Sequence, residues 1–225
     1  MISKEPEKPG FAFDFSGGRL CLDFANTVGG SRPNAPVERL NSYADLVSWA
    51  CQAKIVSQPR ARRLIEESAS HPKRAALVLD RARAFREAVY RIWIAEIRQE
   101  HPAEEDLALL NSELAEALPH QRVLKQGDRF LLTWADEDAL ESVLWPVVKS
   151  AGDLLTGDEA RQVRQCEAFS TTECCWLFID ETKNHSRRWC SMADCGNRAK
   201  ARRHYQRKRQ NRDPSTDEAD PPKRS

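Results

Sequence analysis

Four cysteines near the C-terminus stand in two pairs whose spacing suits a structural metal site. Cys166 and Cys174 form the first pair, and Cys190 and Cys195 form the second. Zinc in a structural role takes four soft ligands in a tetrahedron, and thiolates supply them. A module this small buries too little apolar surface to fold alone, so metal binding would supply much of its folding free energy. The spacing therefore predicts one zinc ion held by these four cysteines.

The residues between and after the two pairs predict the elements that position the thiols. Residues 176–179, Trp-Leu-Phe-Ile, are aromatic and aliphatic and predict a strand. Residues 180–185 are polar and predict a turn, after which residues 187–189 return as a second strand. Residues 196–197 suit the start of a helix with a basic sequence. A knuckle, a hairpin and a helix in this order predict a treble-clef-like zinc finger.

The sequence around the second pair resembles a known family. Cys-Gly-Asn-Arg at 195–198 follows Arg-Arg-Trp-Cys-Ser-Met at 187–192 and precedes Ala-Lys-Ala-Arg-Arg at 199–203. This stretch is similar to the CGNR zinc finger, found at the C-terminus of bacterial proteins whose N-terminal domain is called ABATE. Those proteins are regarded as stress-induced transcription regulators. The first cysteine gap is longer here than is usual in the family, and Cys175 stands where the family has glycine. The choice between Cys174 and Cys175 as ligand therefore stays open.

A second, shorter resemblance lies near the N-terminus. Residues 22–27 read Leu-Asp-Phe-Ala-Asn-Thr, which resembles the opening signature of ABATE domains. Asp23 and Asn26 are candidates for a ligand site there; the alternative is that they cap backbone groups or hold a turn. Phenylalanines alternate over residues 11–15, which predicts a strand. Glycines and prolines over residues 29–41 predict a loop.

Helical periodicity dominates the middle of the chain. The Ser-x-x-Asp pattern at 42–45 predicts a capped helix start, and Pro59 predicts the start of a second helix. Apolar residues at helical spacing predict a long helix from Pro72 to about Gln99, with the arginines and glutamates between them on a solvated face. A further helix is predicted over 104–118. A hairpin is predicted over 122–134, and it should pair with the N-terminal strands or pack on helices, because a lone hairpin is marginally stable in water. The last predicted helix of this region is capped by Asp136 and runs to about Leu155.

These patterns predict an α+β protein, with a mostly helical N-terminal domain that contains a small antiparallel sheet and a C-terminal treble-clef-like zinc finger. At 225 residues the chain has room for one substantial domain and one small one. The predicted divisions are a disordered tail over 1–10, an ABATE-like helical domain over 11–157, the CGNR-type finger with its basic helix over 158–212, and a second disordered tail over 213–225.

Charge is unevenly distributed, because a net charge of +1 hides a strongly basic C-terminal region. Between residues 183 and 212 the only acid is Asp194. A basic end on an acidic body predicts a polyanionic partner, and the alternative is simply a solvated helix face. Arginine pairs with guanine and asparagine with adenine, so Arg198 and Asn197 are able to read base edges. The residues predicted to contact nucleic acid are Arg187, Arg188, Asn197, Arg198, Lys200, Arg202, Arg203, Arg207, Lys208 and Arg209.

Several function classes lack their signatures. The sequence holds no phosphate-binding loop, dinucleotide-binding fingerprint, zinc-protease helix or hydrolase elbow, so we expect no enzyme activity. His185 and His204 are alternative zinc ligands, but four thiols already fill a structural site, which leaves no open position for water. The first residues have no signal-peptide pattern, and no run approaches about 18 apolar residues. We therefore expect a soluble, cytoplasmic protein without a membrane partner.

Three functions compete. The leading hypothesis, which the resemblance implies, is a DNA-binding transcription regulator whose N-terminal domain senses a small-molecule signal or mediates homodimer formation. The runner-up is an RNA-binding or ribosome-associated protein that uses the same finger, because phosphate contacts do not distinguish DNA from RNA. The third is an N-terminal enzyme domain with a protein-binding finger, which the missing motifs disfavour.

Overall fold

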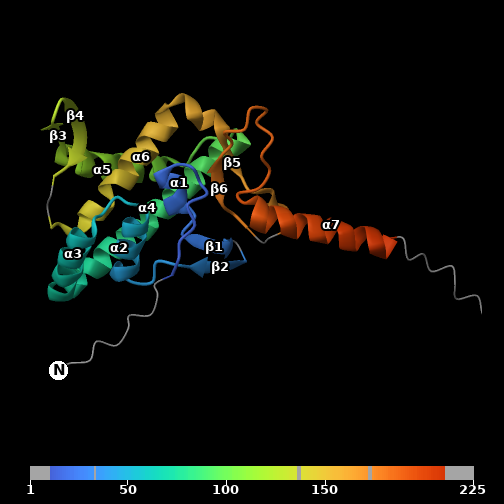
Figure 1. Cartoon of the computed structure of the whole chain (residues 1–225), viewed down its shortest axis with the longest axis horizontal. Coiled ribbons are helices and arrows are strands. Elements are labelled where there is room, and N and C mark those ends of the chain that lie inside the picture. The colour runs from blue at the N-terminus through green and yellow to red at the C-terminus, as the bar shows by residue number, and fades with distance from the viewer. Residues whose placement is uncertain (1–10, 33, 136–137, 172–173, 211–225) are drawn as a thin grey trace, which may run out of the picture. The chain divides into compact units, whose positions relative to one another are not determined.

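The computed structural model describes residues 11–32, 34–135, 138–171 and 174–210 (Figure 1). The predicted disordered tail over 1–10, the predicted tail over 213–225 and the predicted helix cap Asp136 lie outside the described residues. The chain divides into two compact units, one that runs to Cys190 and one that begins at Ser191. No helix in the described part of the chain has both the length and the apolar character needed to cross a membrane.

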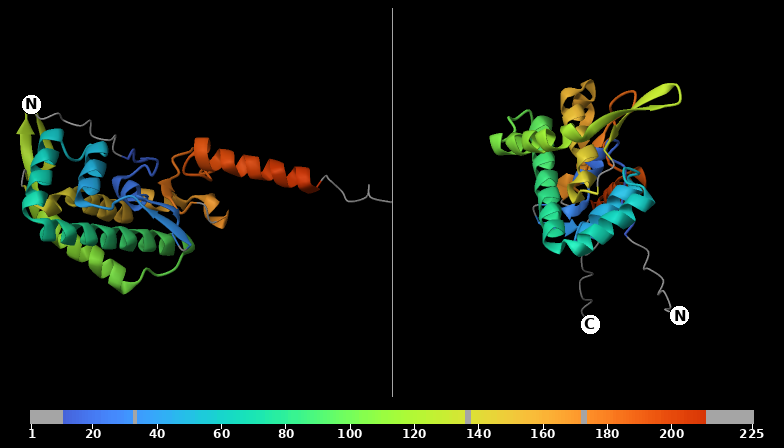
Figure 2. Two further views of the ribbon diagram at one scale, coloured as in Figure 1. Left: turned by 90° about the horizontal axis from the view of Figure 1, so that it is seen from below. Right: turned by 90° about the vertical axis from the view of Figure 1, so that its left-hand side faces the viewer.

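Helices make up most of the first unit. Its described α-helices are α1 (Leu20–Ala25), α2 (Tyr43–Gln52), α3 (Gln58–Ser70), α4 (Pro72–Arg98), α5 (Glu104–Ala117) and α6 (Trp145–Thr156). Short 3-10 turns lie at Leu118–His120, Leu140–Val143, Asp158–Gln162 and Glu167–Thr171. The long helix α4 contacts α1, α2, α3 and α5, and α6 packs on α1 and α5 (Figure 2). Helix α4 is therefore the element around which this unit packs.

Local sequence signals explain where several helices begin. The Ser42 hydroxyl accepts a hydrogen bond from the Asp45 amide, and the Asp45 carboxylate accepts one from the Ser42 amide at 2.8 Å. This reciprocal cap satisfies two N–H groups at the start of α2. Pro59, Pro72 and Pro146 lie in the first turns of α3, α4 and α6, where a missing N–H costs nothing. The predicted starts at 42–45, Pro59 and Pro72 are confirmed.

The apolar core of the first unit is built around aromatic side chains. Trp49, Trp93 and Phe85 are among its largest fully buried residues, and the predicted apolar stripe of α4 faces it. The predicted solvated face of α4 is wrong at Arg86, which is only 3% exposed. Its guanidinium donates to the two carboxylate oxygens of Glu38 at 2.7 and 2.6 Å. A buried charge is tolerated there because a paired carboxylate replaces its water.

The described strands form three separate two-stranded antiparallel sheets. They pair β1 (Val28–Ser31) with β2 (Ala35–Glu38), β3 (Gln121–Gln126) with β4 (Arg129–Trp134), and β5 (Val163–Gln165) with β6 (Leu177–Ile179). The β3–β4 pair confirms the predicted hairpin over 122–134. Among the described residues it pairs with no N-terminal strand, so that expectation is wrong. It packs on a helix instead: the ring of Trp134 lies 6.1 Å from that of Trp145.

Two N-terminal predictions are corrected by the first hairpin. Strands β1 and β2 occupy most of the predicted loop over 29–41, because glycine and proline conceal the strand pattern there. Gly30 has φ +69°, and a Cβ on it would lie 2.5 Å from the carbonyl oxygen of Ala35, so glycine suits this position. The predicted strand over 11–15 is wrong: this segment has no regular secondary structure, although its phenylalanines alternate.

Strand β6 confirms the predicted strand over 176–179, but its partner is β5 and not the predicted return strand over 187–189. The Arg187 amide donates to the carboxylate of Asp180 at 2.9 Å, which holds this stretch in a turn. Leu177 and Ile179 are almost fully buried and belong to the same core as the helices. The strand between the two cysteine pairs is therefore part of the helical domain's core.

The second unit contains the last cysteine and the basic helix. It begins with a π-helical turn over Met192–Gly196 and continues as α7 (Asn197–Gln210). The Ser191 hydroxyl accepts a hydrogen bond from the Asp194 amide at 3.3 Å, which caps the turn. Within the residues of this unit whose burial is described, only Cys195 and Gly196 are buried. Apolar packing therefore contributes little to holding α7.

Candidate metal centre and nucleic-acid interface

The structure brings the four predicted ligands together. The Sγ atoms of Cys166, Cys174, Cys190 and Cys195 all lie within 4.8 Å of one another, and the four side chains are buried. Cys174 and Cys190 have their sulfurs 3.7 Å apart. A tetrahedral zinc ion with Zn–S bonds of about 2.3 Å sets its sulfurs roughly 3.8 Å apart. The spacing therefore fits a four-thiolate zinc site.

The protonation chemistry of the cluster also fits a divalent cation. Hydrogen bonds from Cys174 and Cys190 lower the pKa of the Cys166 thiol. Hydrogen bonds with Cys166 raise the pKa of Cys174 and of Cys190. Without a metal ion, the cluster therefore favours a charge state with one thiolate and protonated neighbouring thiols, because several thiolates this close repel one another. Zinc would displace the remaining protons, and with four thiol ligands its role would be structural.

Cys175 lies outside the metal cluster, although it directly follows a ligand. Its sulfur accepts a hydrogen bond from the Arg32 amide at 3.2 Å. The cysteine also contacts the phenol of Tyr90, and burial with this contact raises the pKa of that phenol. Among the described residues the cluster includes Cys174 and not Cys175. The geometry therefore favours Cys174 of the two alternatives that the sequence left open.

The predicted contact residue Arg187 is bound to backbone carbonyls of the finger and of the N-terminal segment. Its guanidinium donates to the carbonyls of Trp189 at 3.0 Å, Ile179 at 3.2 Å and Ser16 at 3.3 Å, and also to the carbonyl of Cys190. These contacts fix the backbone immediately before the second cysteine pair. Its neighbour Arg188 is exposed and pairs with Glu167 at 2.5 Å.

Asp180 organises the turn that precedes those arginines. Its carboxylate is buried, which opposes ionisation, but hydrogen bonds from Thr182 and from the Arg187 amide lower its pKa. His185 adopts φ +46° and places Nδ1 3.1 Å from the Asp180 carbonyl oxygen. His185 is absent from the described metal cluster, as is His204. The predicted polar turn over 180–185 is confirmed, and its histidine serves the turn.

The second pair is buttressed by the residues that follow it. Arg198 donates from Nη2 to the Cys195 sulfur at 3.3 Å and to Asp194 at 3.2 Å. A hydrogen bond to a thiolate stabilises its charge and orients the ligand. The Asn197 amide nitrogen donates to the Ala193 carbonyl at 3.0 Å. Both predicted base-reading residues therefore have structural partners within the finger itself.

Asp23 and Asn26 hold backbone groups, as one of their two predicted roles requires. The Asn26 amide donates to the Leu177 carbonyl at 2.8 Å and accepts from the Leu177 amide at 2.9 Å. The Asp23 carboxylate accepts from the Gly17 amide at 2.8 Å. Burial raises the pKa of Asp23 to about 7. The ligand role of these two residues stays a prediction.

The sequence pattern did not single out other residues that join the first cysteine pair to the helical domain. The Trp176 indole donates to the Val28 carbonyl at 2.9 Å, and the Ile179 amide donates to the Gly17 carbonyl at 2.9 Å. Arg19 pairs with Glu159 through two contacts. Most of these bonds end on backbone atoms, which leave no pattern in the side chains. Only the aromatic run over 176–179 hinted at burial.

Comparison with protein families gives two matches. Residues 18–158 match the ABATE family, described as "putative stress-induced transcription regulator", and residues 162–208 match the CGNR zinc finger. Neither is an enzyme family, and both resemblances predicted from the sequence are confirmed. A search of the curated proteins finds no match. The predicted domain division at 157–158 lies near the gap between the matches and stays a prediction.

Proposed function

Because the chain belongs to the ABATE family and ends in a zinc-binding CGNR finger, we propose that it is a DNA-binding transcription regulator. In this proposal the finger contacts DNA. The N-terminal domain senses a signal or mediates homodimer formation, and the protein acts in the cytoplasm without catalysing a reaction. The observation that supports DNA contact most directly is the surface of α7.

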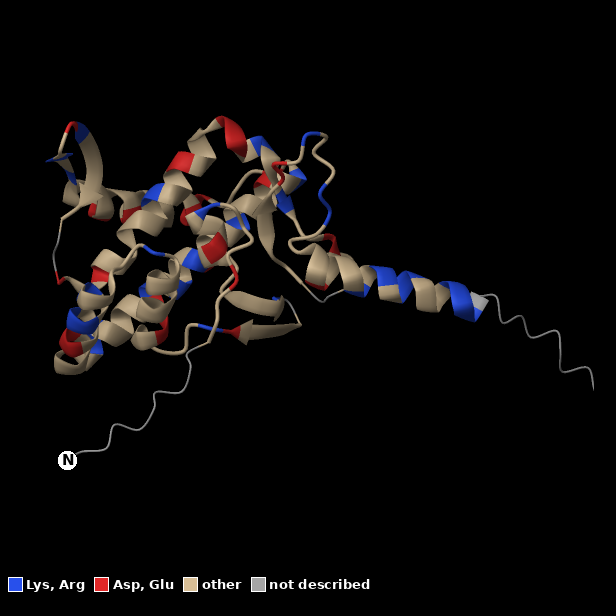
Figure 3. Ribbon diagram, in the orientation of Figure 1, with Lys and Arg blue, Asp and Glu red and all other residues tan. Residues whose placement is uncertain are grey.

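Helix α7 carries positive charge along its length. Its Lys and Arg residues are Arg198, Lys200, Arg202, Arg203, Arg207, Lys208 and Arg209, and no acid lies between Asn197 and Gln210. Figure 3 shows the Lys and Arg positions in blue along the ribbon of α7. Six of these seven side chains belong to exposed residues, and Arg202 is partly buried. A basic, solvent-exposed helix without an apolar face is better suited to bind the phosphate backbone of a nucleic acid than to bind in an apolar groove of a protein.

The contacts within the finger divide the predicted nucleic-acid residues into two groups. Arg187, Asn197 and Arg198 bind carbonyls or a cysteine sulfur, so in this proposal they position the finger. Arg188 pairs with Glu167 and would have to exchange that carboxylate for a phosphate. The phosphate contacts come mainly from Lys200, Arg202, Arg203, Arg207, Lys208 and Arg209.

Binding to duplex DNA measured across a salt series tests the proposal. About half of the cations of α7 and its flanking turn face one duplex at a time, which corresponds to about four to six neutralised phosphates. We expect a slope of log K against log salt of roughly −4 to −5. Replacing Arg207, Lys208 and Arg209 with glutamine should reduce the magnitude of that slope by roughly one to two, because about half of these side chains face the duplex and each phosphate contact contributes about 0.9.

The matched control removes three exposed cations of the β3–β4 hairpin, namely Arg122, Lys125 and Arg129. This variant loses the same charge and should keep the native slope. Equal weakening by both triple variants would mean that only net charge matters and would contradict a site on α7. Structured RNA is titrated in parallel, and tighter binding to RNA than to duplex DNA would replace the regulator proposal with the RNA-binding one.

A further inference from the structure

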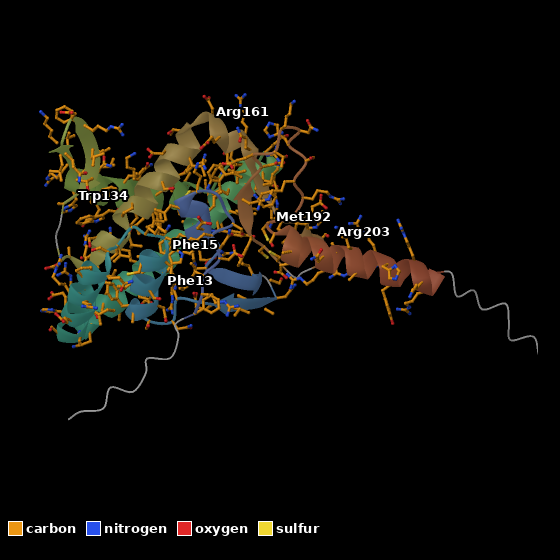
Figure 4. All side chains as sticks on the ribbon, in the orientation of Figure 1. Phe13, Phe15, Trp134, Arg161, Met192 and Arg203 are labelled. Carbon is orange, nitrogen blue, oxygen red and sulfur yellow. The ribbon has the colours of Figure 1, made fainter. Side chains whose placement is uncertain are left out.

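A small cavity of about 90 Å³ lies where the N-terminal segment crosses the start of the helical domain. The side chains that matter for its chemistry are Phe11, Phe13, Asp14, Asp23, Arg39 and Trp176. Phe13 is labelled in Figure 4. One water molecule occupies about 30 Å³ of liquid, so the cavity suits a ligand of only a few heavy atoms. Aromatic rings, two carboxylates and a guanidinium therefore share one small space.

The outer wall of the cavity is an irregular segment fixed by a side chain of α2. Gln52 accepts from the Phe13 amide at 3.0 Å and donates to the Phe11 carbonyl at 2.9 Å. The rings of Phe11 and Phe13 meet edge to face with centroids 5.1 Å apart. This double hydrogen bond explains why residues 11–13 are held in place without strand pairing. The wall is thus part of the fold, and it lines the same cavity as Asp23.

Asp23 is a buried carboxylate that is only partly satisfied. It is 8% exposed, and its Oδ1 accepts from Gly17. Within the described chain no donor reaches its Oδ2. Burial raises its pKa to about 7, and the nearby Asp14 carboxylate raises it further. The described residues supply no cation paired to either acid, which leaves room for a cationic group from a ligand.

Arg39 provides the opposite charge in the same cavity. Its guanidinium stacks over the Phe11 ring at 4.4 Å from the centroid. Among the described residues it has no carboxylate partner, so it can receive an anionic group. Gly17 and Gly29 keep the walls close: a Cβ on Gly17 would lie 2.8 Å from the Asp23 carboxylate, and one on Gly29 would lie 3.4 Å from the Arg39 guanidinium.

We propose that this cavity binds a small zwitterionic amino acid, of the size of glycine or alanine. Its ammonium group would face Asp23 and Asp14 beside the aromatic rings, which favour cations, and its carboxylate would face Arg39. A ligand of one charge alone would leave one side of the cavity without a partner. The inference rests on the proposed function, because the amino acid would be the signal that the N-terminal domain senses.

The position of the cavity gives a route from ligand to finger. Trp176 lines it and lies two positions after the predicted ligand Cys174. Asn26 also lines it and binds both backbone polar groups of Leu177. A ligand there would contact the segment that carries the first cysteine pair. Occupancy would therefore stabilise the strand on which the knuckle is built.

Calorimetric titration of the zinc-loaded full chain with glycine and L-alanine tests the proposal, with methylammonium and acetate as half-ligands. We expect saturable binding of an amino acid that exceeds that of either half-ligand by at least about tenfold. Asp23→Asn should abolish it, and Arg39→Gln should weaken it toward the affinity of methylammonium. Asp80→Asn, on an exposed part of α4, is the matched control and should bind normally. Circular dichroism of each variant checks that it is folded.

Affinity should also rise by about tenfold from pH 6 to pH 8, because the ammonium ligand needs Asp23 ionised and its pKa is about 7. Asp14 and Arg39 are the other charged groups that line the cavity with Asp23. Absence of saturable binding, binding unchanged by Asp23→Asn, or half-ligands as good as the amino acids would overturn the inference. DNA binding is measured on the same samples. Absence of DNA binding alone would contradict the proposed function, whereas absence of amino-acid binding alone would contradict only this inference.

Discussion

The two halves of the finger are held by different forces. In the first half, residues 163–190, strand β6 buries Leu177 and Ile179 in the core of the helical domain and is fixed by Asn26. In the second half, residues 191–210, burial among the side chains described is confined to Cys195 and Gly196. Apolar burial and buried hydrogen bonds therefore order the first half, whereas the second depends on the metal. In this zinc finger, one half is therefore stabilised by the core of the helical domain and the other half by the metal ion.

Removing a ligand from the second half should have the largest effect. Cys195→Ser loses one of four thiolates and should abolish stoichiometric zinc retention and DNA binding, because structural zinc supplies on the order of 10 kcal/mol to such modules. The tryptophan-rich core should keep its near-ultraviolet circular dichroism. Cys51→Ser, outside the metal cluster, is the control. Loss of the core signal together with zinc would show that the two halves are one cooperative unit.

The adjacent cysteines of the first half separate metal binding from packing. Cys174→Ser should lose zinc, while Cys175→Ser should retain it, because the Cys175 sulfur accepts from the Arg32 amide. Metal analysis of both variants purified without chelator decides between them. A reversed pattern, with zinc retained only in Cys174→Ser, would exchange their assigned roles.

Asn26→Ala should lower the stability of the first half of the finger without removing a metal ligand. It leaves the buried amide and carbonyl of Leu177 without partners, which costs about 2–6 kcal/mol at about 1–3 kcal/mol per group. Urea unfolding measures this loss. The exposed Asn111→Ala in α5 should change stability by less than about 0.5 kcal/mol. An Asn26→Ala variant as stable as its control would contradict the role of this amide in holding β6.

Asp23→Asn should produce a smaller, pH-dependent change. Asp23 has its pKa raised by burial from about 4 to about 7, so the folded state holds its proton where the unfolded state has lost it. Stability of the native chain should therefore decline as pH rises from about 4 to 7 and then level off. The variant lacks that decline, so its relative stability should grow over the same range. Parallel curves of urea midpoint against pH would be inconsistent with a buried, proton-binding Asp23.

Residue patterns predicted the parts of the molecule that depend on side-chain type. The four cysteines, the long helix α4 and the β3–β4 hairpin followed from spacing and periodicity. The β1–β2 hairpin was missed because its strands contain two glycines and a proline. The pairing of β6 with β5, instead of residues 187–189, depends on Asp180 and on backbone bonds across the chain. Such long-range backbone contacts leave no local signal in a single sequence.

The candidate site shows the same limit. Basic composition marked α7, but composition alone did not show that Arg187 and Arg198 have partners inside the finger. Asp23 and Asn26 were recognised as a polar pair, whereas the Phe11, Arg39 and Trp176 walls of their cavity come from three distant segments. Spatial convergence of that kind follows from the fold and not from spacing.

Hydrogen exchange on the full chain, with and without a zinc chelator, tests the two-part finger most directly. With zinc, we expect protected amides in both β6 and the turn over Met192–Gly196. After chelation, the Leu177 and Ile179 amides should stay protected, because Asn26 and Gly17 accept their hydrogen bonds. The Gly196 amide, bound to the Ser191 carbonyl at 2.9 Å, should exchange freely. Loss of protection in both segments at once, or in neither, would contradict the division between a core-held and a metal-held half.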